Sequence, residues 1–600
     1  MRSTLIAGAA ICAFGLAVPS ITFVEYQPSD EGAAPSAGLF DPLAYLTSIC
    51  RTRPGGQPRL LARFLASAAA YAATSEAAAG PPPLILGVAS GVMEATVNAA
   101  ALPYFRQGMG LVDGFNHMEA VRAFRAAQAL DPDCAMCLWG EAYALGPNIN
   151  KVMDPADNPR AVEAAHLALQ KAAGASEVER ALIEALQARY SDAIGADRAA
   201  LDAAYSEAMQ VVADRFPEHD QAQALAAEAI MDSQPWDYWE PGGRVAKGNA
   251  AMALARTEAV LARNPDHVLA IHLHIHLTEA SNDPWRSMPY AARLGGLTPG
   301  AGHLVHMPGH TWYRVGMFEE ALEANVVAVA IDEAYLASAG DAASATYRYG
   351  YYPHNLHFVM TTAQMSGAAD TALAMAKRLD AALPMEMADM EGWIQYLKYA
   401  PWTAQLQFGG TDTYEALLAV PEPETELPLI KAAWHYMRGE AAARLGHLDV
   451  ARAEAAELAG IDAATDWAAA VPWTPAPDVL QIMQHLVLGR TAIAEGDLPV
   501  AIDHLLQASD IQSVIQYTEP PFWWYPVRQT LAAALLMDGQ TERAEQQFFA
   551  TLVENPDNAW AYWGLAEARA ARGDADGAAA ARGLYERGWL GAAPPTLSQL

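Results

Sequence analysis

Small and apolar residues recur along this chain at the spacing of packed helix pairs, while the alternation of apolar and polar residues typical of β-strands is scarce. Alanine-rich runs at 120–129 and 561–580 favour helix, because alanine loses no side-chain entropy on ordering. One repeating unit begins at Ala101. At the positions where its two helices would touch, it has small residues, an aromatic residue and a proline. These residues are Gly108, Ala120, Phe124, Ala127 and Pro132.

The same spacing returns further along the chain, and a unit of about 34 residues that folds as helix, turn and helix is the tetratricopeptide repeat (TPR). Two helices of one unit cannot bury their apolar faces alone, so neighbouring units stack. We therefore expect an all-α fold, a right-handed TPR α-solenoid whose concave groove is the binding surface. The further matches are Trp139 and Ala142; Gly439, Gly446 and Ala451; Gly489, Gly496, Ala501 and Ala508; Ala532, Gly539, Ala544, Phe548 and Pro556; and Ala566, Gly573 and Ala578.

The repeats divide the chain into segments, as expected for 600 residues, which is too long for one compact domain. The segment at 381–427 fits the template poorly and could be a decorated repeat or a cap over the groove. The predicted order is a signal peptide at 1–25, a partly disordered linker at 26–95, N-terminal repeats at 96–215, central histidine-rich repeats at 216–380, an irregular helical insertion at 381–427 and C-terminal repeats at 428–600.

The first residues resemble a secretory signal, because Met1-Arg2 precede an apolar stretch at 5–18. This stretch is too short for a membrane span, so we expect an exported protein, periplasmic or extracellular, with at most peripheral membrane contact after cleavage. A second basic and then apolar segment at 51–73 also resembles a signal, which leaves two candidate starts for the secreted chain.

Charge and cysteine content bear on which partners and cofactors the protein can bind. The formal net charge of −32 argues against nucleic acid as a partner and suits a metal cation, although an acidic surface also serves solubility. Cys134 and Cys137 could close a small disulfide or bind a metal in an oxidising compartment. Leu138 follows the second cysteine, which excludes covalent attachment of haem.

Histidines gather in the central repeats, where nine of the 16 lie between His267 and His357. His306 follows His272 by one repeat, and His310 follows His276 by the same 34 residues, since 306 − 272 and 310 − 276 are equal. Residues spaced by three or four share a helix face, so positions 2, 5, 9 and 12 of the first helix form one stripe along the groove. On three units starting at 268, 302 and 353, this stripe holds His272, His276 and Glu279, then His303, His306, His310 and Tyr313, then His354 and His357.

Imidazoles arranged in this way suit a transition metal such as zinc, copper or iron, and histidines at i and i+4 chelate from one helix face. We take His272, His276, His303, His306, His310, His354 and His357 as metal ligands. Glu279 could be a further ligand or a catalytic general base on a metal-bound water. His274 points away from this stripe, and the zinc-peptidase string H-E-x-x-H is absent from the sequence.

Acidic and aromatic residues extend the predicted groove. A preceding unit that starts near Asp220 would add Glu228 and Asp232 to the same wall. Trp236 and Asp237, within the string PWDYW, could line a substrate pocket, although such residues more often pack at helix junctions.

Several strings in residues 95–430 resemble those of a family of exported bacterial tetratricopeptide-repeat proteins. The resemblance implies the repeat fold but no particular activity. The strings are YFRQG at 104–108, GFNH at 114–117, CAMCLWG at 134–140, GPN at 146–148, PWDYW at 235–239, HLHIHLTEAS at 272–281, GHLVHMPGH at 302–310 and YPHNLHF at 352–358.

Two functions fit these features. The first is a protein that binds a transition metal through the histidine cluster in its groove and that could be a metalloenzyme. The second is a metal-free TPR scaffold whose groove binds a peptide or a cell-envelope protein. The sequence leaves open whether the protein is an enzyme, because no set of nucleophile, base and orienting group is visible.

Overall fold

A computed structural model describes residues 82–88, 93–193, 195–390, 392–472 and 474–600. The chain divides into two units, Met1–Asp41 and Pro42–Leu600, and every described residue belongs to the second unit. The predicted signal peptide at 1–25 lies outside the described residues, as does the predicted linker up to residue 81.

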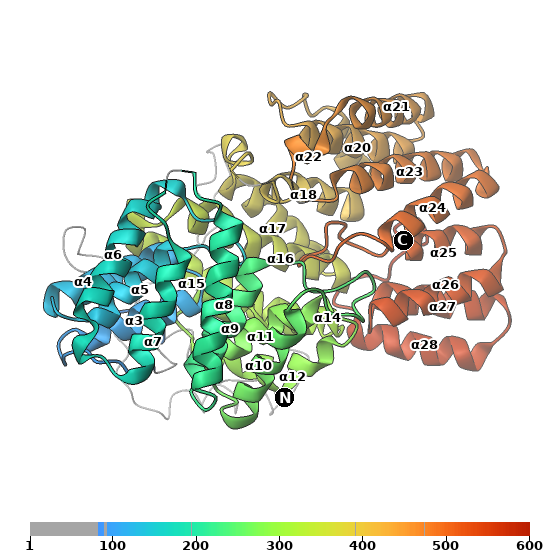
Figure 1. Ribbon diagram of the computed structural model, residues 1–600. Helices are drawn as coiled ribbons and strands as arrows, with labels where there is room; N and C mark the ends of the chain where they lie inside the picture. Colours follow the sequence, from blue (N-terminus) through green and yellow to red (C-terminus); the bar gives the residue numbers. More distant parts are fainter. Residues whose placement is uncertain (1–81, 89–92, 194, 391, 473) are drawn as a thin grey trace, which may run out of the picture. The chain divides into compact units, whose positions relative to one another are not determined.

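Helices that follow one another in the sequence pack against one another throughout the described residues, which confirms the predicted all-α TPR solenoid (Figure 1). The described part of the chain contains no β-strand, only isolated bridges that pair Asn148 with Lys151 and Trp239 with Ala246. None of its helices combines the length and the apolar character needed to cross a membrane.

The N-terminal repeats are locked together by an aromatic side chain that fills the space left by two glycines. A Cβ atom at Gly108 or Gly140 would lie 2.6 or 2.4 Å from the buried ring of Phe124, so the three helices approach closely only because these glycines lack one. The helices here are α3 (Leu102–Asp113), α4 (His117–Leu130), α5 (Ala135–Leu145), η1 (Pro155–Asp157), α6 (Asn158–Lys171), η2 (Ala172–Gly174), α7 (Glu177–Leu186), η3 (Gln187–Arg189), α8 (Arg198–Arg215) and α9 (Asp220–Ser233).

Two features of this region bear on the sequence predictions. Cys134 and Cys137 form a disulfide at the start of α5, with an S–S distance of 2.07 Å. The end of the segment predicted as a linker packs onto the repeats, because Gln107 donates to the carbonyl of Pro83 at 2.9 Å and Gly300 donates to that of Gly87 at 3.1 Å.

The central repeats carry the histidines on short, interrupted helices. Pro308 lacks a backbone N–H and begins a new helix directly after Met307, so one predicted helix is divided into α13 and α14. The helices are α10 (Ala250–Arg263), α11 (Val268–Glu279), η4 (Pro284–Ser287), α12 (Met288–Leu297), α13 (Gly302–His306), α14 (Pro308–Arg314), α15 (Phe318–Ala339), η5 (Gly340–Ala342), the π-helix η6 (Tyr347–Tyr351), α16 (Tyr352–Ser366) and α17 (Ala369–Ala382).

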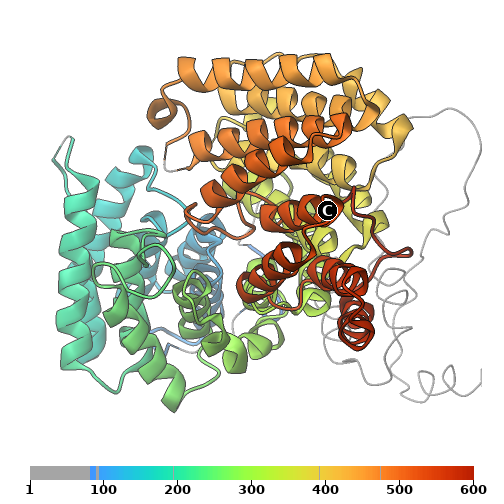
Figure 2. The same cartoon turned by 90° about the vertical axis from the view of Figure 1, so that its right-hand side faces the viewer.

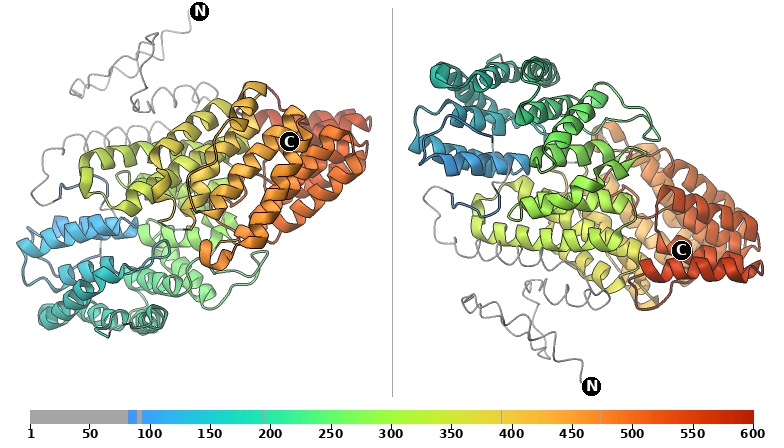
Figure 3. Two further views of the ribbon diagram at one scale, coloured as in Figure 1. Left: turned by 90° about the horizontal axis from the view of Figure 1, so that it is seen from above. Right: turned by 90° about the horizontal axis from the view of Figure 1, so that it is seen from below.

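The segment predicted as an irregular insertion is helical, and its longer helix packs against α17 and α20. The helices that follow it stack as hairpins, which Figures 2 and 3 show side by side in orange and red. Gly446, Gly496, Gly539 and Gly573 end the first helix of each hairpin with φ between 74° and 81°, a conformation that other residues rarely adopt. The helices are η7 (Met385–Met387), α18 (Ile394–Phe408), α19 (Thr411–Leu418), α20 (Pro428–Leu445), α21 (Leu448–Ala464), α22 (Trp467–Ala470), α23 (Ala476–Glu495), α24 (Leu498–Gln512), α25 (Val527–Met537), α26 (Thr541–Glu554), α27 (Ala559–Ala571) and α28 (Ala575–Gly588).

Asp332 on α15 joins the elements that carry the central histidines. Its buried carboxyl accepts hydrogen bonds from the Tyr347 hydroxyl at 2.6 Å and from the Asn355 amide at 2.7 Å. A Cβ atom at Gly302 would lie 1.9 Å from the same carboxyl, so α13 begins directly against it. Burial outweighs the two hydrogen bonds and raises the pKa of Asp332 to about 7.

Replacing Gly140 with alanine should destabilise the protein by about 1–3 kcal/mol, the usual cost of an extra methyl group in a filled core. Gly460→Ala is the matched control, because Gly460 lies within α21 with no atom near its Cβ position, and this change should stabilise by roughly 0.5–1 kcal/mol. Urea denaturation followed by circular dichroism measures both effects. Equal effects of the two substitutions would contradict the proposed packing of Phe124 against Gly140.

Asp332→Asn should remove a pH dependence of stability. The carboxyl has a pKa of about 7 in the folded protein against 3.8 for an unperturbed aspartate, so its stabilisation is complete below about pH 4 and is lost as the pH rises through 7. The loss is on the order of 4 kcal/mol, at ~1.4 kcal/mol per pKa unit. With chelator present, the melting temperature between pH 5 and pH 8 should fall less in Asp332→Asn than in wild type, whereas the exposed control Asp341→Asn should follow wild type.

Candidate metal centre

The buried histidines come from four helices that meet in the central repeats. Helix α11 carries His272, His276 and Glu279 on one face, because they are spaced by four and three residues. The other helices contribute His303 and His306 from α13, His310 from α14 and His354 from α16. These side chains are buried except for the half-buried His354, so they lie inside the described fold and not on an exposed surface.

Three imidazoles converge in what we call the first triad, which consists of His272, His276 and His303. The Nε2 atom of His272 lies 3.1 Å from Nε2 of His276 and 3.2 Å from Nε2 of His303. One nitrogen of each ring lies within 4.8 Å of the other two, so the three nitrogens could ligate a single ion.

A second triad repeats this arrangement with His306, His310 and His354. The Nε2 atom of His306 lies 2.7 Å from Nε2 of His310 and 3.1 Å from Nε2 of His354. In both triads a pair of histidines four residues apart supplies two nitrogens, and a histidine of the next repeat supplies the third.

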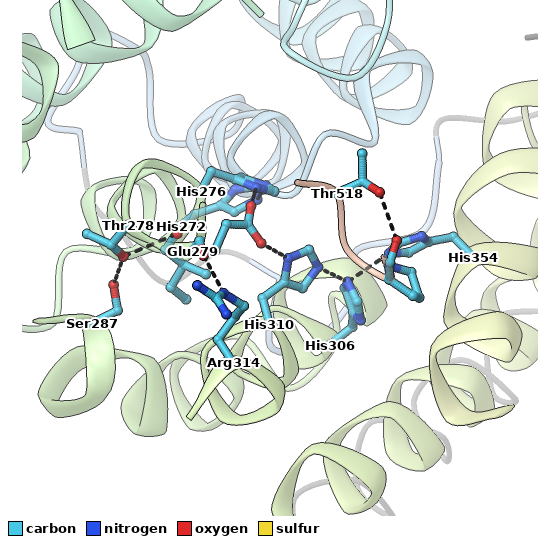
Figure 4. Close-up of polar contacts among 12 residues, drawn as sticks. His272, His276, Thr278, Glu279, Ser287, His306, His310, Arg314, His354 and Thr518 are labelled. Carbon is cyan, nitrogen blue, oxygen red and sulfur yellow. Dashed lines mark hydrogen bonds and ion pairs between the residues drawn. The ribbon is translucent and has the colours of Figure 1, made fainter. Parts of the chain in front are cut away.

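The carboxylate of Glu279 joins the two triads (Figure 4). One oxygen lies 2.8 Å from Nδ1 of His276, and the other lies 2.5 Å from Nδ1 of His310. Arg314 fixes the end of α11 in turn, because its guanidinium donates to the backbone carbonyls of Glu279 at 2.7 Å and of Ser281 at 3.1 Å.

The acceptors on the outer side of the rings determine which nitrogen carries the hydrogen. The partners of the Nδ1 atoms are the Glu279 carboxylate for His276 and His310, the carbonyl of Asp113 for His272 at 2.6 Å, and the side-chain oxygen of Asn325 for His306 at 2.6 Å. Since all of these are acceptors, each Nδ1 must donate a hydrogen, and a neutral ring then has a lone pair at Nε2. Lone pairs therefore face one another within the His272–His276 pair and within the His306–His310 pair.

Burial opposes a positive charge on most of the triad histidines. Burial and the neighbouring imidazoles hold the pKa well below 6.5 for four histidines, His272, His303, His306 and His354. Burial also lowers the pKa of His276 despite the nearby carboxylate. For Glu279 burial acts in the opposite direction, but the attraction of His310 and the hydrogen bonds from His276 and His310 outweigh it and lower the pKa to about 2.

Aromatic rings enclose both triads. Phe115 lies with its ring centroid 4.4 Å from that of His272 and 5.5 Å from that of His303, and its φ of 57° is unusual for a residue with a side chain. Phe358 packs at 5.0 Å from His306 in the same way. The strained backbone at Phe115 is maintained where its ring covers the first triad.

A loop of the C-terminal repeats, residues 513–526 between α24 and α25, reaches the same region; we call it the covering loop. The side chain of Gln516 donates to the carbonyl of Trp236 at 3.5 Å, and the ring of Tyr517 lies 5.0 Å from the guanidinium of Arg314. The hydroxyl of Thr518 donates to the carbonyl of Pro520 within the loop at 3.0 Å (Figure 4). The covering loop therefore contacts two residues that neighbour the first triad and Glu279, and sequence reasoning missed it.

Glu519 is the acidic residue of the covering loop. Its carboxyl is buried, and neither oxygen has a hydrogen-bond partner among the described residues. Burial and the negative charge of Glu279 raise its pKa well above 4.5, against the pull of Arg314. The signal that could have revealed this residue is the length of the connection, which interrupts the short turns of the other C-terminal repeats.

Several predicted site residues lie elsewhere. His357 does not join either triad, and burial alone lowers its pKa to about 4. Asp237 is not a pocket residue, because its exposed carboxylate pairs with Lys247 at 2.5 Å. Tyr313 is a core residue that packs against Phe318 and Phe358. The prediction of Trp236 as a site residue is better supported, since its ring meets the edge of His276 at 5.2 Å.

Glu228 and Asp232 form a separate buried cluster in the N-terminal half. Glu228 accepts a hydrogen bond from the Tyr143 hydroxyl, and Asp232 pairs with Arg189 at 2.8 Å. Burial raises the pKa of Glu228 to about 7 and also raises that of Asp232. Their polar partners are therefore a tyrosine and an arginine, and not the imidazoles of the predicted groove.

Comparison with known proteins adds little to this site. No protein-family model matches the chain, and no curated protein matches it. Among solved structures it is similar to the TPR domain of P58(IPK), with 15% identity over 57% of this chain and 89% of that one and a TM-score of 0.17. It is also similar to the human IFIT1 dimer with PPP-AAAA (12% identity, 82% and 91% coverage, TM-score 0.29) and to Naa15/Naa10 bound to HypK-THB (12%, 81% and 70%, 0.20).

Proposed function

We propose that this protein binds two first-row transition-metal ions, one in each histidine triad, as the centre of a metalloenzyme. The observation that carries the proposal is that three Nε2 atoms converge twice, with the central atom of each triad 2.7–3.2 Å from the other two. Nitrogens that ligate one tetrahedral zinc ion at about 2.0–2.1 Å are roughly 3.3 Å apart, which is close to these separations.

Protons alone would not satisfy the triads. One shared proton can join two nitrogens, but it leaves the third lone pair of the triad facing them. Further protonation would place several positive charges side by side in a buried site, which the lowered histidine pKa values oppose. A divalent ion can accept three lone pairs at once.

The ligand set favours copper or zinc. Neutral imidazole suits both metals, whereas the familiar iron site combines two histidines with a carboxylate. Glu279, the carboxylate that joins the triads, already accepts hydrogen from two Nδ1 atoms. Its proposed role is therefore to orient the ligands and increase their basicity, and not to ligate the ion or act as a base.

Three protein ligands leave a fourth position open on each ion, as in catalytic metal sites, whereas structural zinc sites use four. Glu519, buried in the covering loop, is the candidate for proton transfer at this centre. A metal-free scaffold leaves these buried imidazoles without a role, because a peptide in an open groove could not reach them.

Export remains part of the proposal, since a disulfide between Cys134 and Cys137 suits an oxidising compartment such as the periplasm.

Metal analysis of the purified protein should find two equivalents of copper or zinc per chain. His303→Ala removes a ligand of the first triad, and His354→Ala removes one of the second, so each variant should retain about one equivalent. His357→Asn is the matched control, because this buried histidine lies outside both triads, and it should retain two. Folded wild type without metal after reconstitution would refute the proposal, and loss of metal in the control alone would refute the assignment of the triads.

Glu279→Gln should weaken both metal sites by about 10- to 100-fold, the usual effect of losing an outer carboxylate partner. An amide has one oxygen, so it can accept hydrogen from only one of the two Nδ1 atoms that Glu279 serves. Competition with a chromophoric chelator measures both affinities in one titration. An effect confined to one site would show that Glu279 does not couple the triads, and Glu457→Gln on the exposed face of α21 serves as the control for the loss of one charge.

A further inference from the structure

The last residues of the described chain lie inside the C-terminal repeats. After α28, Trp589 packs against Trp560 at 4.8 Å and Leu590 donates to the carbonyl of Ser366 at 2.9 Å. The chain then turns at Thr596, whose carbonyl accepts from the backbone of Gln599 at 3.0 Å. The side chain of Leu600 is completely buried, and the C label in Figure 1 marks its position beside α25.

Three helices hold this segment through its backbone. Arg490 on α23 donates to the carbonyl of Ser598 at 3.2 Å and to that of Leu600 at 3.3 Å. Arg444 on α20 donates to the carbonyl of Ser598 at 3.3 Å, and the hydroxyl of Thr530 on α25 donates to the carbonyl of Leu600. These bonds recognise carbonyl groups and not the side chains of the segment.

The two arginines are held in position by a carboxylate that is not part of the segment. Glu440 accepts from Arg490 at 3.2 Å and from Arg444 at 3.3 Å, so one carboxylate orients both guanidinium groups. Arg490 is buried, yet it keeps donors that point at the segment. A small cavity lined by Tyr436, Trp524 and other residues adjoins Gln599.

This arrangement has the features of a bound peptide in a repeat groove: directed donors on three successive hairpins, contacts to carbonyl groups and one buried aliphatic side chain. Leu600 is the one fully buried side chain of the segment Thr596–Leu600, while Leu597 packs half-buried against the core. Another polypeptide with a leucine-like residue at the position of Leu600 would therefore satisfy the same backbone donors and the same buried pocket.

We propose that the groove between α20, α23 and α25 is a peptide-binding site that the segment Thr596–Leu600 occupies and thereby closes. Its partner is a protein segment that presents backbone carbonyls to Arg490, Arg444 and Thr530 and places an aliphatic side chain in the pocket of Leu600. The site is separate from the histidine triads and does not depend on the proposed metal.

Leu600→Asp tests this proposal by expelling the segment, since a buried carboxylate without a partner is costly. The probe is a fluorescent peptide with the sequence of residues 594–600, and its binding is followed by fluorescence anisotropy. Wild type should bind it weakly, because the attached segment competes at an effective concentration in the millimolar range. Leu600→Asp should bind it at least ~10-fold more tightly, and the same peptide with aspartate in place of its last leucine should not bind.

Val553→Asp is the matched control, because this valine on α26 is exposed and the change adds the same charge. It should bind the probe as weakly as wild type. A folded Leu600→Asp variant that gains no affinity would overturn the proposal, and so would an equal gain in Val553→Asp. The metal content of Leu600→Asp should match that of wild type, so failure here is distinguishable from failure of the metal proposal.

A second design covers the case in which Leu600→Asp does not fold. A protease site inserted between Gly591 and Ala592 allows the segment to be cut after the protein has folded. Cut protein incubated with excess labelled peptide should exchange its own segment for the label, as seen by gel filtration. Exclusion of the label from the cut, folded protein would show that the segment is a structural part of the fold and would overturn the proposal.

Discussion

The buried carboxylate of Glu279 is the interaction on which the candidate centre depends. Each of its oxygens accepts hydrogen from a histidine of a different repeat, His276 on α11 and His310 on α14. Both rings thereby take the tautomer that directs the Nε2 lone pair inward. A buried charge of this kind is stable only because it has these two partners and because Arg314 fixes the backbone that carries it.

Repetition explains how one chain builds the same triad twice. In the repeat that starts at residue 268, positions 5 and 9 are His272 and His276, and position 2 of the next repeat is His303. The following repeats place His306, His310 and His354 by the same rule. The rule ends there, because the third repeat has His357 at position 5 but Thr361 at position 9, so no third pair of imidazoles forms.

The two halves of the described chain contribute differently to enclosing this centre. The N-terminal repeats provide the ring of Phe115 and the carbonyl of Asp113, which meet the first triad. The C-terminal repeats provide the covering loop, whose Glu519 is buried near Glu279 and whose Trp524 lines the cavity beside Gln599. One loop therefore contacts both the surroundings of the proposed metal centre and those of the proposed peptide groove.

The sequence by itself determined the helix pairs, their register and the repetition of the pair His272 and His276, one repeat later, as His306 and His310. It could do so because spacing along one helix fixes the face on which a side chain lies. Only the tertiary structure separated His303 from His306, which are three residues apart on α13 but belong to different triads. It also excluded His357 and buried the cluster. The reason is physical: the repeat pattern states where a side chain points from its own helix, whereas the stacking of helices and the path of long connections decide which side chains meet.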